Sequence, residues 1–88
     1  MKLFGSVTYD KETKMWNIEC PPHVRLRFMR VFEGVSKWSL GKIILSDSIT
    51  NCRDLVWFLT RYPMKINSAV YKYLTKQFNI FEKQLEIL

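Results

Sequence analysis

The sequence contains little cysteine and little histidine: two cysteines and one histidine among 88 residues. A tetrahedral zinc site needs four ligands, usually from these residue types, and neither cysteine belongs to a CxxC pair. We therefore expect no metal site and no cofactor. We expect Cys20 and Cys52 to be reduced and buried.

Glycine is also scarce, with three residues in the chain, and no glycine-rich phosphate loop or HExxH pattern is present. Phosphoryl transfer requires a phosphate cradle, a metal-binding carboxylate and a lysine in fixed geometry. No segment offers the first of these, so we predict no catalytic residues and no enzymatic activity for this chain. His23 is better explained as a surface residue in the first turn of a helix than as a base.

Long apolar runs are missing as well. No run approaches the roughly 18 residues that are needed to cross a bilayer, and the opening MKLFGSVTYD lacks the apolar segment and cleavage site of a signal peptide. We expect a cytoplasmic protein with no membrane partner.

Apolar and basic residues dominate what is present. Hydrophobic residues make up 48% of the chain and aromatics 15%, which is typical of a folded globule with an aromatic core. Fourteen lysines and arginines outnumber eight acidic residues, for a net charge of +6. Because nucleic acid is the commonest partner of a small basic domain, this balance favours an acidic partner.

Period-two alternation predicts a β-hairpin formed by residues 2–9 and 14–20, and a third strand is expected around residues 42–46. Whether residues 35–40 form a strand of their own is left open. One strand face of the hairpin is predicted to carry Leu3, Val7 and Tyr9, and the facing strand Trp16, Ile18 and Cys20.

Three helices are expected. The first follows Pro21 and Pro22 and ends near Gly34, and the second is capped by Ser48 and covers residues 49–62. The third starts near Ser68. Its apolar residues are spaced by three and four, which is typical of a helix packed on its own domain more often than of a coiled coil, so we expect a monomer. The predicted seam contains Tyr71, Leu74, Phe78, Phe81, Leu85 and Leu88.

The predicted fold class is α+β: a small antiparallel sheet of about three strands, with two helices packed on one face and a C-terminal helix crossing or extending from it. The expected division is a ββαβα domain over residues 1–66 and a helix over residues 67–88. That helix has no capping residue at its end, which we interpret as leading into further chain.

The first helix separates its residues by type. At 100° per residue, Val24, Phe28, Val31 and Phe32 share an apolar side. The opposite side carries the basic residues His23, Arg27 and Arg30. The residues predicted to contact phosphates are Arg27, Arg30, Lys37 and Lys42, with His23 as a supplement.

The second helix places an aromatic residue among charges. Trp57 lies between Arg53 and Arg61 at helical spacing, which is typical of a base-stacking platform beside guanidinium groups. The alternative interpretation is that Trp57 covers the edge of the core and that Arg53 pairs locally. These three residues form a second candidate patch.

Two segments, RVFEGVSKWSLGKIILSDS (residues 30–48) and CRDLVWFLTRYPM (residues 52–64), carry a family resemblance. Their order and spacing resemble the N-terminal segment of phage and prophage DEAD/DEAH-box helicases of the Swi/Snf type, and residues 1–24 are similar to the same segment. The tail after Pro63 matches less well, and the helicase motor is absent. More distantly, the chain is similar to the HARP domain of annealing helicases.

The resemblance implies a compact module that precedes a helicase motor and helps it to engage branched DNA, in a bacterial or phage-infected cell. On this basis we expect a DNA-binding accessory domain that grips duplex, forked or single-stranded DNA for a motor in the same parent chain. The alternative is a protein-interaction module that docks onto the motor without touching DNA. In that case the last helix and exposed aromatics such as Trp38 would make the contacts.

Overall fold

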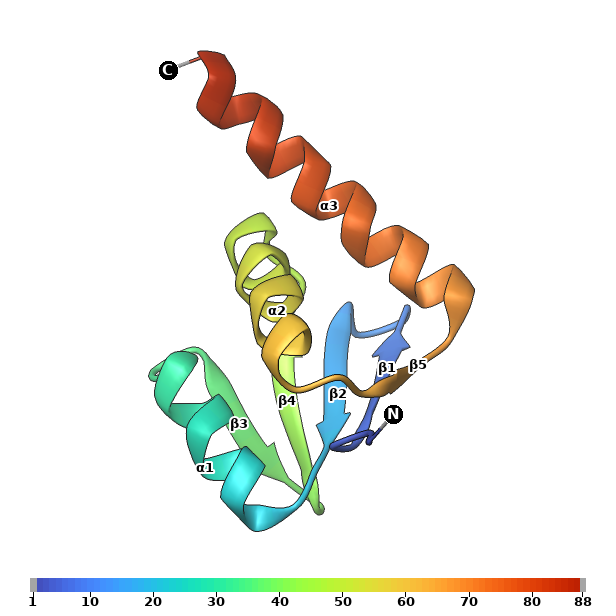
Figure 1. Ribbon diagram of the computed structural model, residues 1–88, viewed down its shortest axis with the longest axis vertical. Helices are drawn as coiled ribbons and strands as arrows, with labels where there is room; N and C mark the ends of the chain where they lie inside the picture. Colours follow the sequence, from blue (N-terminus) through green and yellow to red (C-terminus); the bar gives the residue numbers. More distant parts are fainter. Residues whose placement is uncertain (1, 88) are drawn as a thin grey trace.

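The computed structural model describes the backbone of residues 2–87 and the side chains of residues 2–80, and its fold is α+β, as expected (Figure 1). In chain order the elements are β1 (Ser6–Asp10), β2 (Met15–Glu19), α1 (Pro22–Val31), β3 (Ser36–Ser39), β4 (Lys42–Ser46), α2 (Ile49–Arg61), β5 (Lys65–Ile66) and α3 (Ser68–Ile87).

The sheet has five strands in the described part of the chain, in the order β3-β4-β2-β1-β5, rather than about three. Its pairs are antiparallel except that β5 runs parallel to β1, so the sheet is mixed. The order ββαβα that was predicted for residues 1–66 becomes ββαββαβ, and α3 follows. Both additional strands lack a periodic signal, because β3 reads SKWS and β5 is two residues long.

The predicted hairpin of β1 and β2 is confirmed, with Val7 opposite Ile18 and Tyr9 opposite Trp16. Leu3, however, is 50% exposed and does not share the buried face. The reason is Gly5, whose φ of +153° interrupts the strand before it begins at Ser6. A side chain at Gly5 would place its Cβ 2.0 Å from the Glu19 carbonyl oxygen, so only glycine fits there.

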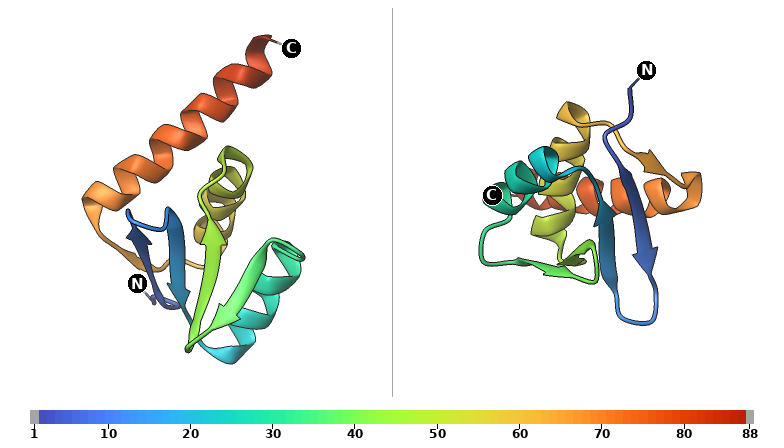
Figure 2. Two further views of the ribbon diagram at one scale, coloured as in Figure 1. Left: turned by 180° about the vertical axis from the view of Figure 1, so that it is seen from behind. Right: turned by 90° about the horizontal axis from the view of Figure 1, so that it is seen from below.

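All three helices cover the same face of the sheet, and the other face is open, as the view from behind shows (Figures 1 and 2). The covered face buries strand residues that the pairing register places on one side. None of the residues on the open face is fully buried. The buried strand residues are Val7, Trp16, Ile18, Ile43 and Leu45.

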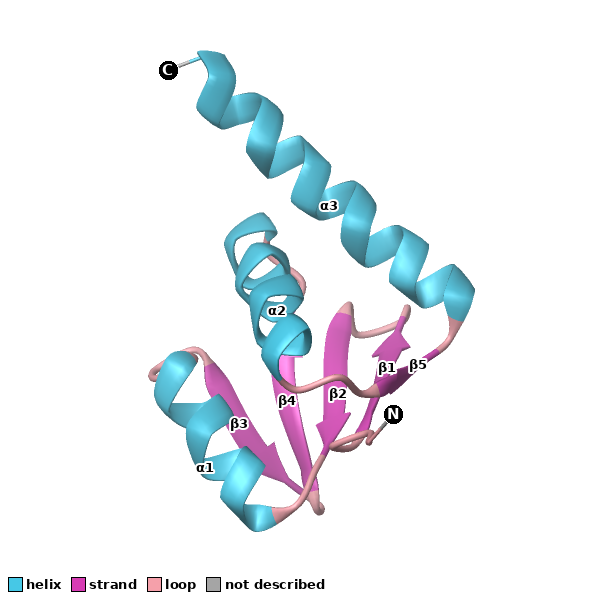
Figure 3. Cartoon of the chain, in the orientation of Figure 1, coloured by secondary structure: helices cyan, strands magenta, loops and turns pink. Residues whose placement is uncertain are grey.

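Helix α1 begins at Pro22, where a missing backbone N–H costs nothing, and ends at Val31 before a turn that includes Gly34 (Figure 3). Phe28 and Phe32 are buried as predicted. Val31 is 59% exposed, contrary to the prediction, because it lies at the margin of the apolar stripe in the last residue of the helix.

Aromatic rings join α1 to α2 and confirm the expected aromatic core. Phe28 stacks on Phe32 with ring centroids 4.4 Å apart and meets the Phe58 ring edge-on at 4.8 Å. Phe58 in turn stacks on Tyr62 at 4.9 Å. This stack fixes how the two helices lie across the sheet.

Helix α2 is capped as predicted, since the Ser48 hydroxyl accepts a hydrogen bond from the Asn51 N–H at 3.1 Å. The helix ends at Arg61, two residues before Pro63. Both cysteines are free thiols, but only Cys52 is buried; Cys20 is half-buried. Burial raises the pKa of the Cys52 thiol to about 11, so it behaves as a small apolar core residue.

The first half of α3 packs on α2 and on the covered face of the sheet, with Leu74 fully buried. Tyr71, from the same predicted seam, is 46% exposed. Helix α3 begins at Ser68. The side chains of Phe81, Leu85 and Leu88 lie outside the described residues.

Candidate nucleic-acid interface

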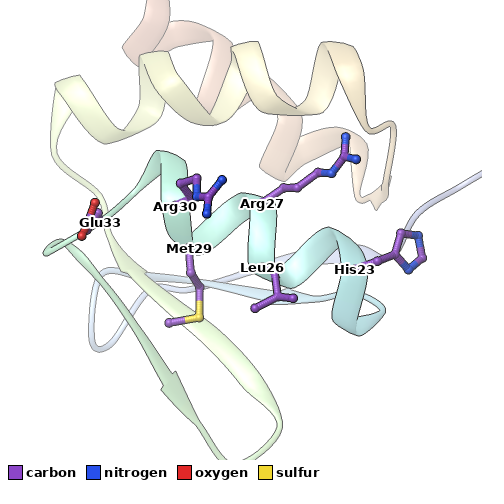
Figure 4. Close-up of a pocket in the computed structure, with 6 residues that line it drawn as sticks. All are labelled: His23, Leu26, Arg27, Met29, Arg30 and Glu33. Atoms are coloured by element: carbon purple, nitrogen blue, oxygen red, sulfur yellow. The ribbon is translucent and has the colours of Figure 1, made fainter.

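The outer face of α1 carries three exposed basic side chains, at His23, Arg27 and Arg30. Figure 4 shows that Arg27 and Arg30 point toward α2, whereas Leu26 and Met29 point toward the β3–β4 hairpin. An open hollow of about 550 Å³ lies along this face. It is lined by His23, Leu26, Arg27, Met29, Arg30 and Glu33.

Little acidic charge opposes these cations. No residue between Pro22 and Val31 is acidic, and the side chain of Pro21 gives the helix no capping hydrogen bond. Among residues with described side chains two ion pairs occur, Lys42 with Glu19 and Arg53 with Asp54, and neither includes a cation of α1. The positive pole of the helix lies beside His23 and is not neutralised by an acidic residue of the first turn, whereas Arg30 lies in the last turn next to the negative pole.

Two arginines of α1 are held by aromatic residues of neighbouring elements. The Arg27 guanidinium donates a hydrogen bond to the Tyr62 hydroxyl at 2.6 Å, at the end of α2. The Arg25 guanidinium lies over the Trp38 ring of β3, 4.2 Å from its centroid. Such contacts limit the side-chain rotamers and keep both positive charges. We call the surface formed by His23, Arg27 and Arg30 the α1 basic face.

The second predicted patch divides into two kinds of residue. Trp57 is 69% exposed and Arg61, one turn further along α2, is exposed too. Arg53 pairs locally, because its guanidinium contacts the Asp54 carboxylate at 2.8 and 2.9 Å. Arg61 directly precedes Tyr62, the residue that contacts Arg27, so the exposed part of this patch borders the α1 basic face.

The two predicted lysines lie elsewhere. In the β3–β4 ladder Lys37 is opposite Ile44 and Ser39 is opposite Lys42, which places both lysines on the open face of the sheet. They are exposed there, away from the arginines of α1. The structure therefore separates Lys37 and Lys42 from the α1 basic face, and Lys42 is also 3.8 Å from Glu19.

A second polar cluster lies where α3 meets the sheet. The Asp47 carboxylate accepts hydrogen bonds from the Tyr9 and Tyr73 hydroxyls, both at 2.5 Å, and Gln77 donates to Tyr73 at 2.9 Å. Burial and the hydrogen bond to Asp47 raise the pKa of Tyr9. The pKa of Tyr73 is also raised, mainly by its own hydrogen bond to Asp47. We call these four residues the Asp47 latch. Its polar groups are satisfied by one another, which suits a structural role.

Sequence reasoning missed the residues that position the interface. Arg25 contacts Trp38, 13 residues further along the chain, and Arg27 contacts Tyr62, 35 residues further along. No local spacing identifies these pairs, because the fold alone brings the partners together. The partners of Asp47, Tyr9 and Tyr73, are likewise far from it in the sequence.

Comparison of the chain with protein-family models, curated proteins and solved structures finds no match. Within the described residues, no group of three or more histidine, cysteine, aspartate or glutamate side chains is arranged to hold a metal ion. No helix in that part of the chain is long and apolar enough to cross a membrane.

Proposed function

We propose that this chain is a DNA-binding accessory domain that holds duplex or branched DNA through phosphate contacts for a separate ATPase motor. The observation that carries the proposal is the α1 basic face, where exposed cations lie on a helix that contains no acidic residue. Phosphate contacts of this kind supply most of non-specific DNA affinity.

The neighbouring residues of α2 extend this surface. Arg61 adds a further cation beside Tyr62, and the exposed ring of Trp57 suits stacking on an unpaired base at a fork. His23 supplements the arginines at the start of α1. Lys37 and Lys42 lie on the open face of the sheet. They would contact phosphates only of DNA that passes around the β3–β4 hairpin.

The proposal assigns catalysis to another part of the parent protein, which, as the family resemblance implies, would be a Swi/Snf-type helicase of phage or prophage origin. This chain would then act as a monomer in the cytoplasm of the host cell and hold DNA for the motor. It needs no cofactor for that role, because electrostatic contacts alone bind phosphates.

The alternative is a module that docks onto the motor and does not touch DNA. Exposed apolar side chains on the helices favour it, with Leu26 at 70% and Trp57 at 69% exposure. In addition, α3 extends beyond the rest of the domain, where another chain segment can reach it (Figure 1).

Titration of labelled duplex, forked and single-stranded DNA with the intact chain separates these functions. Non-specific binding has dissociation constants of about 10⁻⁴ to 10⁻⁶ M, and roughly four phosphate contacts give a log–log salt slope near −3.6 on duplex. If the chain does not bind DNA at low salt, or if its DNA affinity does not change with salt concentration, the DNA-binding function is rejected and the docking module remains.

A further inference from the structure

The turn of the β3–β4 hairpin contains a leucine that the fold does not use. Leu40 is 98% exposed, more than any other large apolar residue described, and therefore contributes nothing to the core. It occupies the first position of a two-residue loop, Leu40-Gly41, between the paired residues Ser39 and Lys42.

The backbone of this turn favours a different residue. Leu40 has a φ of 51° and Gly41 a φ of 79°, and a hairpin loop with two positive φ values prefers Asn-Gly or Asp-Gly. A bulky side chain in the left-handed region is costly. Neither turn chemistry nor packing accounts for leucine at this position.

The hairpin holds the leucine firmly. Two residues after the turn, Ile43 is fully buried, and Leu45, two residues further along β4, is fully buried as well. On β3, Trp38 is clamped by the Arg25 guanidinium. The apolar tip therefore projects from a short and well-anchored arm.

Cations lie near this tip on both faces of the hairpin. Lys42, which is 3.8 Å from Glu19, follows the turn directly, and Lys37 lies on the same strand face. Arg25 lies over the Trp38 ring. The turn is at the same end of the molecule as the first turn of α1, which carries His23 (Figures 1 and 2). Proteins that kink DNA combine these features: an apolar side chain enters a base step while cations hold the flanking phosphates.

We propose that Leu40 is a wedge that inserts between adjacent base pairs of duplex DNA held by the α1 basic face. The inference rests on the proposed DNA binding and adds to it a means of unstacking the duplex. A partly unstacked step is easier to open, which suits a domain that supplies branched DNA to a motor.

A duplex with 2-aminopurine at successive positions tests the wedge, because the fluorescence of this base rises when it is unstacked. With the intact chain the fluorescence is expected to rise on binding. Leu40→Asn should abolish the rise, while the salt slope of binding changes by less than about one unit because the phosphate contacts remain. Its melting temperature should rise by a few degrees, since asparagine suits the turn.

Two further variants complete the test. Leu40→Met keeps an apolar tip and should retain the fluorescence rise. Leu3→Asn removes another exposed leucine near the β5 edge of the sheet and should also retain it.

The outcomes distinguish the wedge from the binding on which it depends. DNA binding without a fluorescence rise, or a rise that Leu40→Asn retains, overturns the wedge and leaves the proposed function intact. Absence of DNA binding overturns both. Leu40-dependent binding to phosphatidylserine vesicles, with no rise on DNA, would assign the tip to a membrane surface and also overturn the wedge.

Discussion

The polar groups of the Asp47 latch are paired with one another where α3 meets the sheet, whereas at the opposite end the basic side chains of α1 and the tip of the β3–β4 hairpin face outward. At the α3 end, the Asp47 latch satisfies two phenols with one carboxylate. At the α1 end, arginines lie without acidic partners among the described side chains, and Leu40 is exposed on a costly turn.

The comparison indicates which part of the domain holds the fold together and which part is available to a partner. Local departures from good folding rules tend to concentrate at functional sites. At the α1 end the departures are an uncapped helix without acidic residues and Leu40 at positive φ, whereas Lys14 in the β1–β2 turn also has a positive φ, of 56°.

The largest effect is expected where the two ends share a core. Phe32 is 1% exposed and stacks on Phe28, so Phe32→Ala should cost about 3–5 kcal/mol of unfolding free energy. Domains of this kind have about 5–15 kcal/mol in total, and the loss should be visible as a large shift of the urea midpoint. A variant that melts within a degree or two of the parent would show that Phe32 does not contribute to the core.

A smaller effect is expected from the latch. Asp47→Ala removes the shared acceptor of Tyr9 and Tyr73 and should cost about 1–3 kcal/mol, because two half-buried hydroxyls lose their partner. DNA affinity measured in parallel should stay the same. If the variant bound DNA more weakly while keeping its stability, the latch would belong to the interface and the comparison would fail.

The latch also predicts a dependence on alkaline pH. The pKa values of Tyr9 and Tyr73 are raised above the ordinary value of 10.0, so above that pH the folded state keeps protons that the unfolded chain loses. The contribution of the latch is complete below about pH 10 and falls as the pH rises toward the folded-state values. Denaturation at several alkaline pH values should show a steeper loss for the parent than for the Tyr9→Phe/Tyr73→Phe variant, and equal slopes would contradict it.

The smallest change in stability is expected at Trp57. Because this side chain is 69% exposed, Trp57→Ala should change the unfolding free energy by less than about 0.5 kcal/mol. Single-stranded DNA should bind at least about fivefold more weakly, as expected for loss of one stacked base. An unstable variant with unchanged DNA affinity would instead support the interpretation that Trp57 covers the edge of the core.

Much of the fold could be predicted from local signals. Ser48 and Pro63 bound α2, and the alternation around Trp16 predicts the central strand, because these features act over a few residues. β5 could not be predicted, since two residues carry no period and its pairing with β1 depends on chain folding. The exposure of Val31 depends on where the helix meets its neighbour, which a helical wheel does not contain.

The candidate site was predictable only within one helix. Helical spacing correctly places His23, Arg27 and Arg30 on an exposed face. It does not place Lys37 and Lys42, because the face of a lysine in a strand depends on the ladder register. Contacts between distant residues, such as those of the Asp47 latch, leave no spacing in the sequence.

The claim that the α1 basic face holds DNA is best tested with two matched double variants. Arg27→Gln/Arg30→Gln and Lys72→Gln/Lys76→Gln each remove two exposed positive charges from one helix, so net charge changes equally. In a salt titration with labelled duplex, the arginine variant should bind more weakly, with a log–log slope reduced by about two units, while the lysine variant keeps nearly the parent slope. Equal weakening by both variants would show that DNA responds to overall charge, and would contradict the account.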